Sequence, residues 1–203
     1  MSAPISAQLH NLTQSLNVLD ASVSPDEKIP LLEFLNAVDS LLAVFETVGS
    51  DVLEGGRTDL QENVVKIRNA VQSFLGQSQY LQHLIEAERA TGQHNATEGL
   101  LWITRGLEFY VTSIKRIAGN GSEKLADSIM NAYKDTLKTH HGFVAKMAIK
   151  VAVSKTCPTR DELLSRLGQD PSTVTSTLES SARSFERMLH ILSPFLSRSG
   201  IKF

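Results

Sequence analysis

The sequence predicts an all-α protein, folded as a two-layer helical sandwich of about eight helices. Its apolar residues recur with the period of an α-helix in one segment after another, and none of the segments alternates convincingly, as a half-buried strand would. Proline and glycine residues stand between these segments. The segment LLWITRGLEFYVTSIKRI is apolar over most of its circumference, which places it centrally, with helices on both sides.

The individual helices can be placed in order along the chain. The period of the apolar residues assigns the first three to residues 31–45, 60–74 and 100–117. Residues 123–153 hold one or two more, with Gly142 as a kink or a break. The next helix begins at Thr159, where Glu162 occupies the capping-box position, and the last begins at Asp170, where Pro171 suits the first helical position.

Composition narrows the class of protein. The 203 residues fit one domain, residues 1–203, and 41% hydrophobic residues suffice for a packed core. A net charge of −2 disfavours a general nucleic-acid binder, and the single cysteine, Cys157, allows no intramolecular disulfide. The N-terminus lacks a signal-peptide pattern, and no apolar run approaches the ~20 residues of a membrane span. We therefore expect a cytosolic protein.

A polar trio borders the apolar stripe of the helix at residues 60–74. Asp59, Asn63 and Lys66 are spaced i, i+4 and i+7, which gathers a carboxylate, an amide and an ammonium group within roughly a 60° arc of a helix. Leu60 and Ile67 belong to the apolar stripe beside them. The trio therefore lies at the edge of the buried face and not opposite it. The residues alone leave two interpretations open, a solvated face and a binding site.

Two further positions are candidates for ligand contact. Trp102 and Phe109 lie off the main apolar stripe of their helix, on the side that also carries Arg105. Aromatic residues placed in this way either pack a second layer or meet a ligand. His141 lies in an apolar neighbourhood, two turns after Tyr133. A histidine there is more often a hydrogen-bonded core residue than a ligand-binding one, so this position also stays open.

Catalytic and metal chemistry find no support in the sequence. It contains no nucleophile elbow, phosphate-binding loop or His-Glu-x-x-His motif. Cys157 stands beside Pro158 without an obvious partner base, and His140 and His141 point in different directions on a helix, which disfavours joint metal binding. We predict no enzyme, no metal and no cofactor. The residues by themselves indicate a helical protein with an interaction site of unknown kind.

Three motifs together resemble the glycolipid transfer protein family. TDLQENVVKIR follows the family's D-x-x-x-N-x-x-K pattern, LWITRGLEF its W-x-x-R-G-L arrangement, and HHGF its His-Gly-aromatic step. The order and spacing of the motifs cover about residues 25–195. The matching positions, in order, are Asp59, Asn63 and Lys66; Trp102 and Arg105; and His141, preceded by Tyr133.

The resemblance implies a fold and an activity. Members of the family fold as an all-helical two-layer sandwich, bind one sphingolipid and move it between membranes without chemistry. A sugar ring offers hydroxyls at its rim and C–H groups on its faces, which suit polar side chains and an aromatic platform. The resemblance implies that Asp59, Asn63, Lys66 and Trp102 bind the headgroup. It implies that Asp59 and His141 bind the ceramide amide. Tyr133 and Arg105 would position these ligand-binding side chains, with Arg105 orienting Asp59.

The lipid chains and the membrane require apolar surfaces. Phe143 follows His141 and Gly142 at a position where some members carry tryptophan, so we expect it to contact the membrane, helped by Lys138 and Lys146. Phe203 is a candidate for an aromatic residue that folds back near the site in some members. The candidates for the apolar chain pocket, each of which also has an ordinary core interpretation, are Phe45, Leu53, Val144, Ile149, Leu163 and Phe185.

The charges near the predicted site indicate which kind of headgroup it binds. A phosphate favours a cluster of cationic donors, whereas this chain offers Lys66 and Arg105 beside the neutral Asn63. We therefore expect a glycosphingolipid with a simple sugar. The alternatives are ceramide-1-phosphate transfer or sphingolipid sensing on the same fold, or a helical adaptor without a lipid ligand. The expected partners are the glycosphingolipid and a transient membrane surface, with no nucleic acid, and the absence of a heptad seam favours a monomer.

Overall fold

The computed structural model describes residues 5–49, 51–74, 76 and 79–198, and these residues form helices joined by short loops, with no strand among them. The all-α prediction is confirmed. Nine α-helices and one 3₁₀ helix are described, against the expected eight or so, because the chain also forms α1 and α4, which sequence periodicity had not placed. The bounds are α1 Ala7–Ser22, α2 Leu31–Val48, α3 Asp51–Ser73, α4 Leu81–Ala90, α5 Asn95–Gly119, α6 Leu125–Asp135, η2 Leu137–Thr139, α7 Phe143–Thr156, α8 Arg160–Leu167 and α9 Pro171–Arg198.

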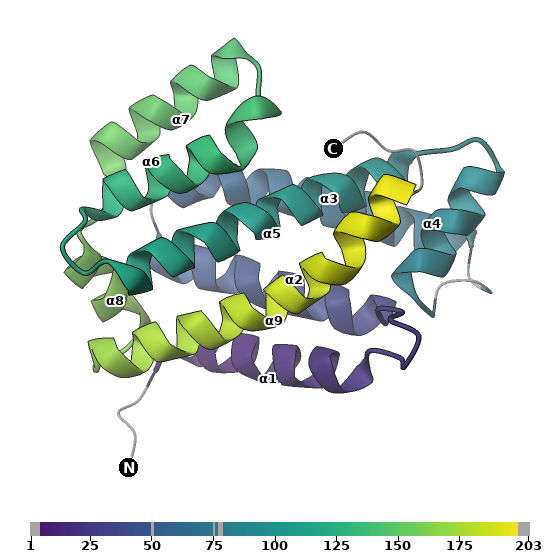
Figure 1. Ribbon diagram of the computed structural model, residues 1–203, viewed down its shortest axis with the longest axis horizontal. Helices are drawn as coiled ribbons and strands as arrows, with labels where there is room; N and C mark the ends of the chain where they lie inside the picture. The colour runs from purple at the N-terminus through teal and green to yellow at the C-terminus, as the bar shows by residue number, and fades with distance from the viewer. Residues whose placement is uncertain (1–4, 50, 75, 77–78, 199–203) are drawn as a thin grey trace.

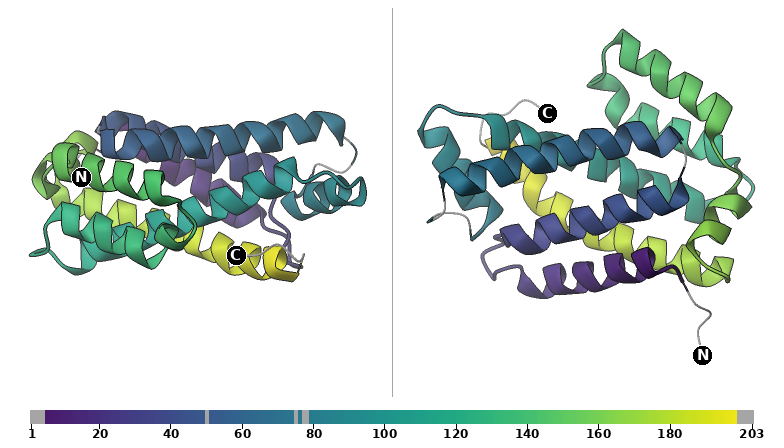
Figure 2. Two further views of the ribbon diagram at one scale, coloured as in Figure 1. Left: turned by 90° about the horizontal axis from the view of Figure 1, so that it is seen from above. Right: turned by 180° about the vertical axis from the view of Figure 1, so that it is seen from behind.

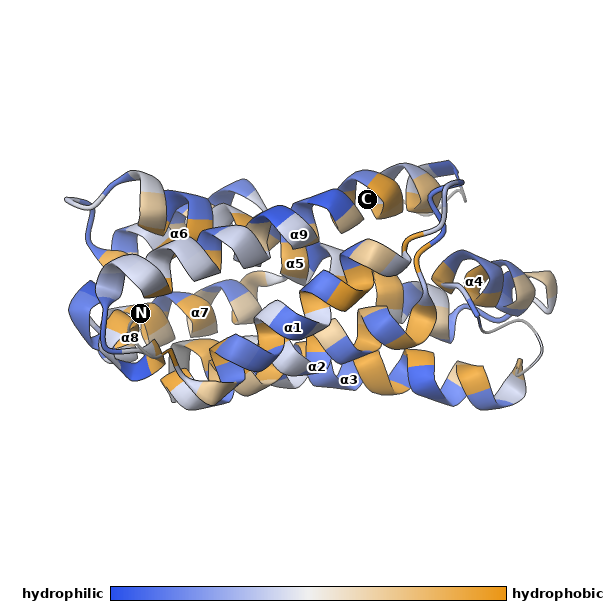
Figure 3. Ribbon diagram, turned by 90° about the horizontal axis from the view of Figure 1, so that it is seen from below, coloured by the Kyte–Doolittle hydropathy of each residue, from blue (hydrophilic) through white to orange (hydrophobic). Residues whose placement is uncertain are grey.

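The helices form two layers, as predicted. One layer contains α1, α2 and α3, and the other contains α6, α5 and α9 (Figures 1 and 2). The layers meet where α3 packs on α5 and where α1 packs on α9. Hydrophobic and hydrophilic residues are interspersed along these helices (Figure 3), as expected of amphipathic helices. Three short helices complete the fold: α4 lies against α5 and α3, α7 against α3 and α6, and α8 against α2 and α9.

The central position predicted for LLWITRGLEFYVTSIKRI is confirmed, because α5 packs against α3, α6 and α9. Its start is fixed by a carboxylate from the preceding helix, α4. Glu88 of α4 is 1% exposed and accepts hydrogen bonds from the backbone N–H groups of Ala96 and Thr97, at 2.7 and 2.8 Å. These are donors that the first turn of a helix leaves without a partner, so Glu88 sets where α5 begins.

A glycine controls the contact between α3 and α5. A Cβ atom added to Gly99 would lie 2.9 Å from the backbone oxygen of Asn63 and 3.2 Å from the Cβ of Lys66. Farther along α5, a Cβ added to Gly106 would lie 3.6 Å from a methyl group of Leu60, an ordinary contact. The two helices therefore approach most closely beside Asn63 and Lys66, and this approach brings the polar side of α3 next to the first turns of α5.

The predicted helix boundaries are confirmed in the second half of the chain. Thr159 and Glu162 form the expected capping box at the start of α8. The Asp170 side chain accepts the backbone N–H of Thr173 at 2.9 Å, as an N-cap does at the start of α9. Gly142 is a break, since α6 ends before η2 and α7 begins anew at Phe143. The connection between α6 and α7 therefore carries His141 on a turn instead of on a continuous helix.

Candidate functional site

The three polar residues of α3 lie together at the crossing with α5. Asp59 is exposed and Lys66 is partly exposed, whereas Asn63 is 8% exposed. The Asn63 Nδ2 donates to the backbone oxygen of Asp59 at 2.7 Å. Its Oδ1 is buried and has no hydrogen-bond partner among the described residues. A buried acceptor without a partner costs about 1–3 kcal/mol, which a ligand hydroxyl could recover by donating to it.

Trp102 of α5 stands at the centre of a group of ring contacts. Its indole stacks on the His141 imidazole, with ring centroids 5.9 Å apart and an interplanar angle of 25°. The guanidinium carbon of Arg105 lies 4.7 Å from the centroid of the Trp102 ring, at the range of a cation–π contact. Arg105 thus helps to position Trp102, and its expected orientation of Asp59 stays a prediction. Trp102 itself remains partly exposed, so its ring can meet a ligand.

Tyr133 also contacts His141. The Tyr133 hydroxyl lies 3.3 Å from Nδ1 of His141, and the two ring centroids are 5.7 Å apart. Tyr133 is 3% exposed, so this contact is made by a fixed residue of α6. The structure thus brings together Trp102, Tyr133 and His141, three of the residues that the sequence singled out. Asp59 belongs with them electrostatically, since its carboxylate and the His141 ring influence each other's pKa.

The protonation states of Asp59 and His141 follow from their surroundings. Loss of solvent raises the pKa of Asp59, an effect that His141 opposes and Glu62 reinforces. Burial lowers the pKa of His141 below 6.5, an effect that the Asp59 carboxylate opposes. A lowered pKa means that the folded state binds this proton less well than the unfolded state, so the contribution of His141 to stability is present above pH 6.5 and is lost as the pH falls below it.

We predict that Asp59→Asn lowers the pKa of His141 further, because it removes the negative charge that favours the imidazolium. The ring signals of the six histidines, followed by NMR as a function of pH, provide the measurement. Glu62→Gln is the matched control, since Glu62 neighbours Asp59 on α3 and is not among the groups that shift His141. An unchanged or raised His141 pKa in Asp59→Asn would show that the two side chains are not coupled.

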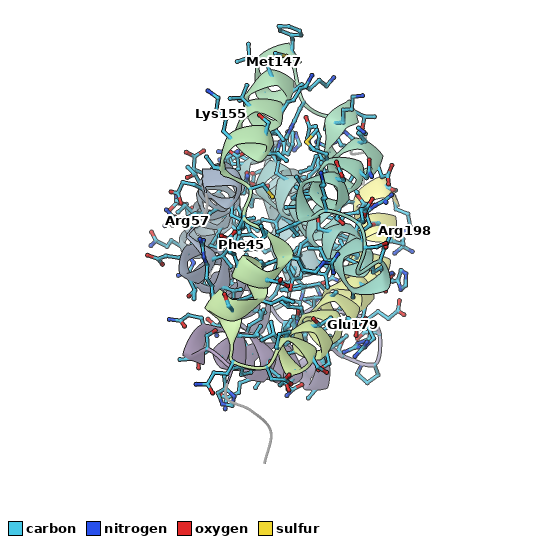
Figure 4. All side chains as sticks on the ribbon, turned by 90° about the vertical axis from the view of Figure 1, so that its left-hand side faces the viewer. Phe45, Arg57, Met147, Lys155, Glu179 and Arg198 are labelled. Carbon is cyan, nitrogen blue, oxygen red and sulfur yellow. The ribbon has the colours of Figure 1, made fainter. Side chains whose placement is uncertain are left out.

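Most of the predicted chain-pocket residues lie in the interior. Phe185 is fully buried, Leu163 is 9% exposed, and Phe45, Leu53 and Ile149 are partly buried against the core. Phe45 appears between the two layers when the molecule is viewed along its helices (Figure 4). It meets Phe185 through Tyr110, a residue that sequence reasoning had not singled out.

Tyr110 joins the two layers at this point. Its ring centroid lies 6.1 Å from that of Phe45 on α2 and 5.8 Å from that of Phe185 on α9. Its hydroxyl lies 2.5 Å from the Ser181 hydroxyl, inside the protein. A hydrocarbon chain that enters between the layers at this depth therefore has to displace this aromatic cluster or pass beside it. The sequence signal for Tyr110 was its place in the helical period of α5, which does not reveal its partners on other helices.

The prediction for Val144 is wrong in this structure. Val144 is 81% exposed and so does not line an apolar interior. The apolar neighbourhood predicted around His141 assumed that one helical period continues across Gly142, which would have placed Val144 on an apolar side. Because the chain breaks at Gly142 and α7 starts again at Phe143, this register is lost and Val144 faces outward.

The outer face of α7 is apolar. Four apolar side chains of α7 are largely exposed to solvent, and of its described apolar side chains only Val153 is buried. The helix carries three lysines and no acidic residue. The predicted membrane contact Phe143 is the first of the four; Phe203 lies outside the described residues. The exposed fractions are 78% for Phe143, 81% for Val144, 45% for Met147 and 44% for Val151.

Metal and membrane-spanning features are not found in the part of the chain that the structure describes. Its histidine, cysteine, aspartate and glutamate side chains nowhere gather in a group of three or more that could hold a metal ion. None of its helices is both long and apolar enough to cross a bilayer.

Comparison with known proteins places this chain in a family. The family model for glycolipid transfer protein matches residues 29–169. A glycolipid transfer protein from Aureobasidium melanogenum is 34% identical over 176 residues, which cover 87% of each chain. The crystal structure of HET-C2, a fungal glycolipid transfer protein, matches with a TM-score of 0.80 at 33% identity and covers 100% of this chain and 94% of its own.

The same fold occurs in a protein with another cargo. A crystal structure of mouse ceramide-1-phosphate transfer protein matches with a TM-score of 0.84, covering 94% of this chain and 97% of its own, but at 15% identity it shares the fold alone. The match of the family model over residues 29–169, together with the 34% identity to a glycolipid transfer protein, is decisive. The chain belongs to the glycolipid transfer protein family.

Proposed function

We propose that this protein binds a glycosphingolipid with a simple sugar headgroup and carries it between membranes without changing it chemically. The observation that carries the proposal is the convergence of α3, α5 and the α6–α7 connection. Asn63 offers a buried acceptor without a partner, Trp102 offers a partly exposed ring, and His141 is held against that ring. A plain solvated face would not bury Asn63 at its centre.

Each side chain suits one part of such a lipid. The Trp102 ring gives a flat surface for the C–H face of a sugar, and the Asn63 Oδ1 can accept one of its hydroxyls. Asp59 and His141 can hold the ceramide amide and its neighbouring hydroxyl, where the sugar joins the ceramide. Lys66 at the border of α3 can donate to the sugar rim.

The hydrocarbon chains would occupy the apolar interior between the layers. The candidates are Phe45, Leu53, Ile149, Leu163 and Phe185, with Tyr110 between two of them. Because this interior is packed with side chains, entry of a chain requires the layers or α7 to move apart. Val153 is the one buried apolar side chain of α7, the fewest of any described α-helix, so displacement of α7 uncovers little buried apolar surface.

The outer face of α7 would dock on the membrane. Phe143 and Val144 are the most exposed large apolar residues of the described chain, and Lys146 and Lys150 lie on the same helix. Aromatic residues favour the membrane interface, and lysines favour anionic lipid surfaces. A monomer that acts from the cytosol could thus touch a membrane and leave it again.

We predict that Phe143→Ser slows transfer several-fold while leaving the stability of the protein within about 0.5 kcal/mol, because the side chain is exposed. Flotation of the protein with phosphatidylcholine vesicles would measure the loss of membrane binding directly. Leu32→Ser is a matched control, since Leu32 is 64% exposed on α2. Equal effects of the two changes would argue against a docking role of α7.

Transfer between vesicles tests the function itself. Fluorescent glucosylceramide and fluorescent ceramide-1-phosphate, with the same chains, are offered in phosphatidylcholine donor vesicles, and their arrival in acceptor vesicles is followed in time. We expect transfer of glucosylceramide at a rate well above that of the spontaneous exchange. Faster transfer of ceramide-1-phosphate would favour the phosphate-binding alternative, and transfer of neither would favour an adaptor without a lipid ligand.

A further inference from the structure

Glu98 lies at the candidate headgroup site, although the motifs do not include it. It belongs to the first turn of α5, and its Oε2 lies 3.5 Å from the Nζ of Lys66 on α3. The two side chains are 56% and 37% exposed, respectively, so solvent and a ligand can reach both. Lys66 is one of the two cations that a negatively charged headgroup would be expected to use, and in this structure it already faces a carboxylate.

The position of Glu98 is built into the helix crossing. Glu98, Trp102 and Arg105 are spaced i, i+4 and i+7 and therefore share one side of α5. The polar trio of α3 has the same spacing. The close approach at Gly99, next to Glu98 in the chain, brings these two sides together, with the backbone of Asn63 and the Cβ of Lys66 nearest to α5.

This carboxylate changes the charge of the site. Counted by formal charge, Asp59 and Glu98 balance Lys66 and Arg105, so the site has no excess of positive charge. A phosphate or sulfate ester that reaches Lys66 must also approach Glu98, and two negative groups at this range repel each other. An uncharged sugar meets no such penalty, because its hydroxyls can donate hydrogen bonds to the Glu98 carboxylate.

We propose that Glu98 is a specificity-determining residue that excludes anionic headgroups, phosphate or sulfate esters, and favours uncharged sugars. The proposal rests on the proposed function and deepens it. Removal of one charge at this distance, in partly exposed surroundings, corresponds to a change in affinity on the order of tenfold. The pair with Lys66 is exposed, so the fold does not depend on it.

Two lipids that differ by one charged group test the proposal. Galactosylceramide and 3-O-sulfogalactosylceramide with the same acyl chain are transferred between phosphatidylcholine vesicles, and the ratio of their rates is measured. We expect wild type to favour the neutral lipid, Glu98→Gln to reduce this ratio about tenfold, and Glu98→Lys to reduce it further. High salt should reduce the difference between wild type and Glu98→Gln, because exposed charges are screened.

Glu179→Gln is the matched control. It makes the same change of net charge on α9, on the side of the molecule away from α7 (Figure 4), and should leave the ratio as in wild type. A ratio that Glu98→Gln leaves unchanged, while neutral lipid is still transferred, would overturn the role of Glu98 alone. If wild type transfers neither lipid, the proposed function itself fails, so the two failures are distinguishable.

Discussion

Asp59→Val is expected to abolish transfer of glucosylceramide between vesicles, with a loss of at least about a hundredfold. The carboxylate serves both the sugar and the ceramide amide in the proposed complex, and hydrogen bonds to a charged group contribute about 1.5–3 kcal/mol each. Two such bonds correspond to two or more powers of ten in affinity. Because Asp59 is exposed on α3, its loss should leave the fold intact.

The assay pairs transfer with unfolding in urea. Far-ultraviolet circular dichroism should show the helical content of wild type, and the urea midpoint should change little. Glu62→Val is the control, since Glu62 is exposed on the same helix one turn later, and it should keep most of the transfer rate. Asp59→Val with a rate near that of wild type would remove the central residue from the proposed site.

Trp102→Ala is the second change with a large expected effect. We expect a loss of transfer on the order of tens of fold, because the ring offers the sugar platform and also supports its neighbours. Without it the His141 imidazole loses a stacked partner at 5.9 Å, and Arg105 loses the ring beneath its guanidinium at 4.7 Å. The positions of His141 and Arg105 therefore depend in part on this one side chain.

Trp102→Phe separates the role of the ring as a sugar platform from its role in stacking on His141. A phenyl ring can still stack on His141 but covers less of a sugar face. We therefore expect a transfer rate between the rates of wild type and Trp102→Ala. The measurement is the initial transfer rate at equal protein concentration, with the urea midpoint as a check on folding. Equal rates for wild type and Trp102→Ala would mean that the sugar does not lie on this ring.

Much of the fold was predictable because its signals are local. The apolar period of α5 predicted its central place, and Thr159 with Glu162 predicted the start of α8. The carboxylate of Glu88 at the start of α5 could not be predicted in this way, since it comes from another helix. The prediction that Val144 lines the chain pocket was wrong for a related reason. It continued a helical period across Gly142, where the chain turns and begins a new helix.

In the candidate site, too, local features were predictable from the sequence, whereas features that depend on contacts between helices were not. Asp59, Asn63 and Lys66 share a side of α3 by spacing alone, and the motifs added Trp102 and His141. What spacing could not give was the register of α3 against α5. That register depends on Gly99, and it decides that Lys66 meets Glu98 and that the Asn63 Oδ1 is buried without a partner.

The emission of Trp102 tests the central claim most directly, because it is the only tryptophan of the chain and reports on one place. Titration with phosphatidylcholine vesicles that contain glucosylceramide should shift the emission clearly more than vesicles of phosphatidylcholine alone. The shift should saturate as the sites fill, and Asp59→Val should abolish the difference. An identical response to both kinds of vesicle would contradict a sugar bound on Trp102, and with it the proposed glycosphingolipid site.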